Sequence, residues 1–232
     1  MRIYPVVHIN STERAVAESL AALELGADGI YLIDHHNHDP GTTWQVFSEV
    51  DRRRPAAHIG VNLLGFSTVE VIRQILDAHV SGALSRIPDS VWLDDIRHHG
   101  ATDPDAALVF ARQAAPSLRI VGGIAFKYTP TYTDDADQAR AEVAALENAV
   151  DVVTTSGSGT GSAPPVSKMR AIRAATVKPI AVASGISIDN ITDYAGLVDE
   201  ILVASSVETT PHSGIFDRAT LQDFLTAGRS QG

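Results

Sequence analysis

The feature that most constrains the fold is a strand–helix alternation that repeats eight times along the chain. Short runs rich in Val and Ile, bounded by turn residues, predict strands at 3–9, 29–33, 57–62, 90–93, 118–125, 152–155, 178–183 and 199–204. Between them, apolar residues recur at helical spacing. The first expected helix is capped by Ser11 or Thr12, carries an apolar stripe to Leu25 and ends at Gly26.

The later helices are expected at 42–54, 69–80, from Pro104, and at 134–149, 165–176, 189–195 and 217–226. Strands without strict polar alternation indicate a parallel sheet buried on both faces. Eight strand–helix units of about 29 residues within 232 residues predict an α/β fold, a single (β/α)8 TIM barrel. An open doubly wound sheet is the alternative. No linker or low-complexity segment divides the chain, so we expect one TIM-barrel domain over residues 1–232.

The composition of the chain argues against several classes of function. The formal net charge of −10 argues against a nucleic-acid partner, which calls for a basic surface. The chain has no Cys, which excludes a disulfide framework, a thiolate nucleophile and a Cys-ligated metal. No run of about 18 apolar residues occurs, so we expect a cytoplasmic protein with no membrane partner.

A glycine-rich loop follows the sixth expected strand. Three glycines alternate with hydroxyl residues from Ser156 to Ser162, and a helical pattern begins after Pro165. Such a loop lets the backbone approach an anion closely, most often a phosphate. It is neither a P-loop nor a dinucleotide fingerprint, because the required Lys and glycine spacing are absent. The loop predicts phosphate binding by Ser156, Gly157, Ser158, Gly159 and Thr160; a flexible connection is the alternative.

Two more strands end on small residues. Ser184 and Gly185 follow the seventh strand, and Ser205 and Ser206 follow the eighth. Barrels of this kind often hold a phosphate at these two strand ends. Together with the glycine-rich loop they predict a three-loop phosphate cradle, although small residues would also permit tight turns.

Polar side chains at other strand ends are candidates for catalysis, because barrel sites form at the carboxyl ends of the strands. His8, Asp34 and Asp94 are suited to proton transfer. Lys127 could form a Schiff base, neutralise a phosphate or act as an acid. Asp94 and Asp95 should point in opposite directions, so at most one faces the pocket. No cofactor is firmly implied, although Asp34 and Asp94 could share a divalent ion such as Mg²⁺.

Asn62, His35 and His36 are expected to contact the substrate. The cluster of His35, His36 and His38 with Asp34 and Asp39 could instead ligate zinc. We disfavour zinc, because adjacent loop histidines lack the spacing of a well-formed helical site, and predict no metal site.

The carboxyl-terminal third resembles the BtpA/SgcQ family of barrel proteins. The residues that carry the resemblance are the loop 156–162, the run from Lys178 to Ile186, Asn190-Ile191 and the run from Val203 to Ser206. The resemblance implies a barrel of the ribulose-phosphate-binding type that handles a sugar phosphate or a nucleotide-like compound. The amino-terminal half departs from the family: His8 fits its first strand, but Asn10-Ser11-Thr12 stands where we associate a proline-rich stretch with the family.

These observations favour an enzyme acting on a small phosphorylated sugar or phosphoribosyl compound, by isomerisation, aldol-type cleavage or glycosyl transfer. One alternative is a non-catalytic, BtpA-like factor for assembly or regulation that binds a phosphometabolite. A metal-dependent hydrolase is a second alternative. We also expect the barrel to self-associate into a homo-oligomer, as such barrels often do.

Overall fold

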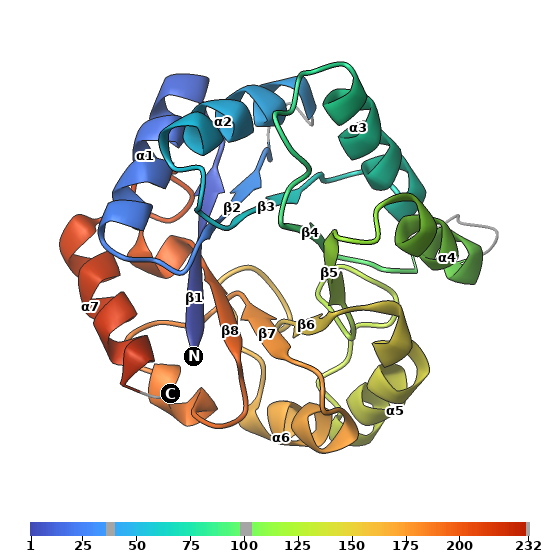
Figure 1. The fold of residues 1–232 in the computed structure, drawn as a ribbon. Helices are drawn as coiled ribbons and strands as arrows, with labels where there is room; N and C mark the ends of the chain where they lie inside the picture. The colour runs from blue at the N-terminus through green and yellow to red at the C-terminus, as the bar shows by residue number, and fades with distance from the viewer. Residues whose placement is uncertain (36–39, 98–103, 231–232) are drawn as a thin grey trace.

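The computed structural model describes residues 1–35, 40–97 and 104–230, with the backbone alone for 104–108. Eight parallel strands pair in chain order and close into a barrel, so the predicted (β/α)8 fold is confirmed (Figure 1). The strands are β1 (Arg2–His8), β2 (Ile30–Ile33), β3 (Ile59–Asn62), β4 (Ser90–Leu93), β5 (Arg119–Gly123), β6 (Val152–Thr155), β7 (Ile180–Ala183) and β8 (Glu200–Val203).

Helices surround the barrel on its outside (Figure 1). They are α1 (Thr12–Glu24), α2 (Pro40–Arg53), α3 (Thr68–Val80), α4 (Pro104–Ala114), α5 (Ala136–Leu146), α6 (Val166–Ala175) and α7 (Arg218–Arg229), with short 3₁₀ helices η1 (Glu147–Ala149), η2 (Ile191–Tyr194) and η3 (Ser205–Val207). Local signals explain their starts: Ser67 and Glu70 form a capping box before α3, and Asp135 and Asp217 cap α5 and α7. None of the helices in these described ranges is both long and apolar enough to cross a membrane.

One expected helix is shorter than predicted. The segment 189–195 forms only the 3₁₀ helix η2 between β7 and β8. The Asn190 side chain accepts the Ser187 N–H and donates to the Gly185 carbonyl, which commits residues 185–190 to a turn. Gly196, with a φ of +72°, then reverses the chain before another helical turn can form.

The barrel interior is a core distinct from the layer between strands and helices. Because side chains alternate along a strand, one set fills the inside: Tyr4, Val6, Tyr31, Ile33, Trp92, Val121, Phe126, Val152, Ala181, Ala183 and Leu202. Tyr31, Trp92 and Phe126 pack edge to face across it. These rings fill the middle of the barrel, so the space above them opens at the carboxyl ends of the strands.

The amino-terminal end of the barrel is closed by a buried ion cluster. The Glu200 side chain of β8 is fully buried and binds Arg2 on the neighbouring strand β1 and Arg119 on β5, which is not adjacent to β8. Arg119 Nη1 lies 3.0 Å from Glu200 Oε2. The cluster neutralises a carboxylate that apolar surroundings would not tolerate alone.

Candidate active site

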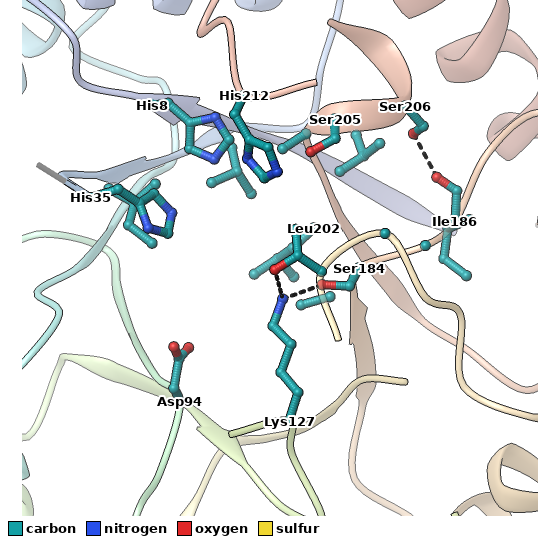
Figure 2. Close-up of a pocket in the computed structure, with 18 of the residues that line it drawn as sticks. His8, His35, Asp94, Lys127, Ser184, Ile186, Leu202, Ser205, Ser206 and His212 are labelled. Carbon is teal, nitrogen blue, oxygen red and sulfur yellow. Dashed lines mark hydrogen bonds between the residues drawn. The ribbon is translucent and has the colours of Figure 1, made fainter. Parts of the chain in front are cut away.

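A cavity of about 710 Å³ opens at the carboxyl ends of the strands. It gathers nine of the residues predicted for the site: His8, His35, Asp94, Lys127, Thr160, Ser184, Gly185, Ser205 and Ser206. Figure 2 shows the histidines on one side of this cavity, with Asp94 and Lys127 reaching into it from another. Side chains of the barrel interior such as Val6, Trp92 and Leu202 form its apolar floor.

Lys127 places an ammonium group in this cavity. Its N–H donates to Ser156 Oγ at 2.8 Å, just after Ala125 bends the chain with a φ of +48°. The Lys127 ammonium donates to Ser184 Oγ and, at 3.3 Å, to Thr160 Oγ1. Burial lowers the pKa of Lys127, while the nearby Asp94 carboxylate works in the opposite direction. The Lys127 ammonium thus lies between the ends of β5, β6 and β7.

Asp94 supplies the cavity with a carboxyl group whose protonation changes near neutral pH. Burial raises the pKa of Asp94 to about 6, against the opposing effect of a hydrogen bond from Asn62. Asn62 Nδ2 donates to Asp94 Oδ1 at 3.1 Å. Asp95 does not line the cavity, which confirms that only one of the two adjacent carboxylates faces it. A carboxyl group with this pKa is suited to general acid or base catalysis.

His8 lies at the end of β1 and is paired with an acidic residue. Its Nδ1 lies 2.8 Å from Oε1 of Glu208, which also accepts the Gly214 N–H at 3.2 Å. The His35 ring packs edge to face on His8 at 5.0 Å between centroids, and the His212 ring lies at 5.9 Å. Three imidazoles therefore share one side of the cavity.

The end of β7 has an unusual backbone. Ser184 and Gly185 have φ values of +95° and +73°. A Cβ on Gly185 would lie 2.0 Å from the Ala163 backbone nitrogen, so only glycine fits beside the passing β6–α6 loop. Ser206 Oγ donates to the Ile186 carbonyl at 2.6 Å and joins the turns after β7 and β8 (Figure 2). Ser184 and Ser205 both line the cavity; the Ser184 hydroxyl accepts from the Lys127 ammonium, and Ser205 lies beside His212 (Figure 2).

The first part of the glycine-rich loop does not reach the cavity. Ser156, Gly157, Ser158 and Gly159 lie outside its lining. Ser156 Oγ accepts a hydrogen bond from the Lys127 N–H and donates one to the Gly157 carbonyl. A Cβ on Gly157 would lie 2.3 Å from the Ser162 carbonyl oxygen, so the loop folds tightly on itself. Its tip, Thr160 and Gly161, is the part that lines the cavity.

Asp34 is also placed away from the cavity. It is buried and borders a separate small space of about 10 Å³ with Thr43 and Phe66, beside α2. Its neighbour His35 faces the main cavity instead, because the alternation of side-chain directions along β2, which ends at Ile33, continues over these two residues. Asn62 borders the same small space and reaches the main site through Asp94. His36, His38 and Asp39 lie outside the described residues.

Sequence reasoning missed Glu208, His212 and Lys168. Glu208 and His212 belong to the segment between η3 and α7, which carries no recognisable motif. Lys168 lies on α6 in an ordinary helical pattern, yet it is fully buried. Its Nζ donates to the carbonyls of Ala125 and Ser156, both at 2.8 Å, and lies 4.8 Å from the Tyr132 ring centre. Burial lowers the pKa of Lys168 to about 8.

Within residues 1–35, 40–97 and 104–230, no three His, Asp or Glu side chains are grouped as a metal ion would need. The predicted sharing of a divalent ion by Asp34 and Asp94 receives no support from their positions, because Asp34 lies outside the cavity that Asp94 lines.

No protein-family model matches the chain, and no curated protein matches it by sequence. Solved structures do match its fold. Phosphoribosyl anthranilate isomerase from Thermus thermophilus matches with a TM-score of 0.66 and 16% identity over 100% of both chains. Geranylgeranylglyceryl phosphate synthase from Thermoplasma acidophilum, in complex with sn-glycerol-1-phosphate, matches with a TM-score of 0.68 and 13% identity over 99% of this chain and 93% of that one. N-(5'-phosphoribosyl)anthranilate isomerase from Pyrococcus furiosus matches with a TM-score of 0.68 and 13% identity over 99% of both chains. At these identities the comparisons establish the TIM-barrel fold of this chain.

Proposed function

We propose that this barrel is an enzyme that binds a small phosphorylated sugar or phosphoribosyl-like compound and acts on it by acid/base chemistry. The observation that carries the proposal is the position of Lys127, whose ammonium is held by the hydroxyls of Ser184 and Thr160. A lysine ammonium among hydroxyl donors is a phosphate-binding arrangement.

The turns after β7 and β8 support a phosphate at the same place. Ser184, Gly185 and Ser205 line the same cavity as Lys127, and Ser184 Oγ accepts a hydrogen bond from the Lys127 ammonium. Gly185 lines the cavity with backbone atoms alone, and backbone N–H groups are donors that bind anions. The phosphate contacts we propose are therefore Lys127, Thr160, Ser184, Gly185, Ser205 and Ser206. Three of the fold neighbours support this proposal. The names of two refer to a phosphoribosyl compound, and the third is described in complex with a glycerol phosphate.

The rest of the cavity suits proton transfer. Asp94 has its pKa raised to about 6, and His8 stands on another wall with an acidic partner. A cavity of about 710 Å³ exceeds the space that a phosphate group needs, which leaves room for a sugar and an attached group. The resemblance to the BtpA/SgcQ family stays a prediction that agrees with this substrate class.

The test is thermal unfolding of the purified protein with ribose 5-phosphate and dihydroxyacetone phosphate, each compared with its dephosphorylated form, and separately with inorganic phosphate. A ligand at 100 times its Kd stabilises by about 2.7 kcal/mol, which raises the Tm of a chain of this size by roughly 5–10 °C. We expect that rise with a phosphate ester and its loss in Lys127→Met.

Arg52→Gln is the control, because Arg52 is an exposed cation on α2 that does not line the cavity. It should keep the full rise. If no phosphate ester stabilises the wild-type protein, or if Lys127→Met responds as the wild type does, the proposed function is wrong. A phosphate ester that binds tightly but is never converted would favour the alternative of a binding or assembly factor.

A further inference from the structure

We propose that Glu208 is a positioning residue that holds His8 as the general base of this site, with Asp94 as the general acid facing it across the cavity. The inference rests on the proposed function, because the proton it moves belongs to the phosphorylated ligand. It goes further by assigning the two proton-transfer roles and by adding Glu208 to the site.

The contact between the two side chains is short and buried. His8 Nδ1 lies 2.8 Å from Glu208 Oε1, with the Glu208 side chain fully buried and that of His8 10% exposed. A carboxylate can only accept, so the proton of a neutral His8 must reside on Nδ1. The other ring nitrogen, Nε2, is then left with a lone pair, which is what a general base requires.

The position of Glu208 is costly for the fold. Its carboxylate is buried, and among the contacts of the described residues its Oε2 has no hydrogen-bond partner. Oε1 receives only the His8 ring and the Gly214 N–H. A buried carboxylate with a half-satisfied hydrogen-bonding capacity destabilises a protein. The same carboxylate, however, stabilises a neighbouring imidazolium, which is the species that forms when His8 accepts a proton.

The surroundings keep His8 aimed at the cavity. Glu208 pairs with Phe216 in an antiparallel bridge, and Glu18 on α1 accepts the Phe216 N–H at 3.0 Å. His35 packs on the His8 ring edge to face, which limits rotation of that ring. Figure 2 shows the His8 ring and the Asp94 carboxyl group reaching into the same space from different strands.

The reaction class that fits is proton transfer beside a carbonyl group. His8 Nε2 takes a proton from the carbon next to the carbonyl, and protonated Asp94 gives its proton to the carbonyl oxygen. The electrons of the broken C–H bond form the C=C bond of an enediol. Return of the imidazolium proton to the neighbouring carbon, and of a hydroxyl proton to Asp94, gives the isomer and restores both groups.

The first experiment needs no ligand. Nitrogen-15 NMR of the histidine side chains, on protein at pH 8, shows which ring nitrogen carries the proton, and His8→Asn identifies the His8 signals. We expect His8 to carry its proton on Nδ1 in the wild type and to shift toward the Nε2–H form in Glu208→Leu. A wild-type His8 protonated on Nε2 would overturn the inference.

The second experiment measures exchange of carbon-bound hydrogen for deuterium in dihydroxyacetone phosphate and ribose 5-phosphate, in D₂O. We expect Glu208→Gln to slow exchange at least about tenfold, part of the roughly 100- to 10,000-fold that a positioned base contributes. The rise in Tm that the same ester causes should be equal in Glu208→Gln and in the wild type. The control Glu49→Gln removes a carboxylate of α2 that pairs with Arg52 and Arg53 outside the cavity lining, and it should exchange at the wild-type rate.

The two proposals fail differently. If a phosphate ester binds and exchanges equally fast in Glu208→Gln, the role of Glu208 is refuted while the phosphate site stands. If no phosphate ester binds, the proposed function is refuted, and the NMR experiment still decides whether Glu208 sets the tautomer of His8.

Discussion

Asp94 should destabilise the folded protein at neutral pH, and removing its charge should reveal the cost. Burial raises the pKa of Asp94 from its usual 3.8 to about 6. Each pH unit of that difference corresponds to about 1.4 kcal/mol, so the full cost is about 3 kcal/mol. This is an upper value, because Asp94 keeps some contact with solvent through the cavity.

The sign of the pH dependence follows from where protons bind. Well below pH 3.8 the Asp94 carboxyl is protonated in both the folded and the unfolded chain, and its burial costs little. Between pH 4 and 6 the unfolded chain releases this proton while the folded one keeps it, so stability falls as the pH rises. Above pH 6 the folded protein carries the whole cost.

The variant Asp94→Asn stays neutral at every pH and can still accept the Asn62 hydrogen bond. We expect its Tm to exceed that of the wild type by up to about 6–12 °C at pH 7.5, and by little at pH 4. Thermal unfolding followed by circular dichroism across this range measures the difference. Asp223→Asn, which removes an exposed carboxyl on α7, should show no such rise. A Tm difference for Asp94→Asn that is equal at both pH values would refute the reasoning.

Three further substitutions test the scaffold around the site by thermal unfolding. Gly185→Ala places a Cβ against the Ala163 nitrogen at a positive φ, and we expect a loss of roughly 1–3 kcal/mol together with loss of the phosphate-ester Tm rise. Lys168→Met removes the donor to two buried carbonyls and should cost about 2–4 kcal/mol, whereas an unchanged Tm would mean that the carbonyls find other donors. Glu200→Ala leaves Arg119 and its partner arginine without their carboxylate and should cost about 3–5 kcal/mol; a stable variant would show that the cluster is dispensable.

The sequence was sufficient to predict the barrel fold, because each strand and helix carries its own local signal. Ser67 and Glu70 mark a helix start, and the run of β-branched residues at β6 marks a buried strand. Boundaries were less certain where side chains compete with the backbone. Asn190 forms a turn that replaces most of the expected helix before β8.

Site residues were predictable to the extent that strand alternation decides their direction. Asp94 lies two residues after the inward-facing Trp92, and it faces the cavity; Asp34 follows the inward-facing Ile33 directly, and it does not. If residues are counted from the inward-facing Ile33 in the same way, His35 and not Asp34 is predicted to face the cavity. Glu208 could not be found this way, because it meets His8 only after 200 residues of chain have closed the barrel.

The buried ammonium of Lys168 has a consequence for the thermodynamics of ligand binding. It fixes the carbonyl of Ala125, two residues before Lys127, and that of Ser156, where the glycine-rich loop begins. Two segments that border the cavity are therefore ordered when the protein folds. The conformational entropy of ordering them is lost during folding and does not have to be lost again on association. Binding at this site should accordingly resemble docking into a preorganised receptor, with an entropy penalty confined to the ligand and the few side chains that reorient around it.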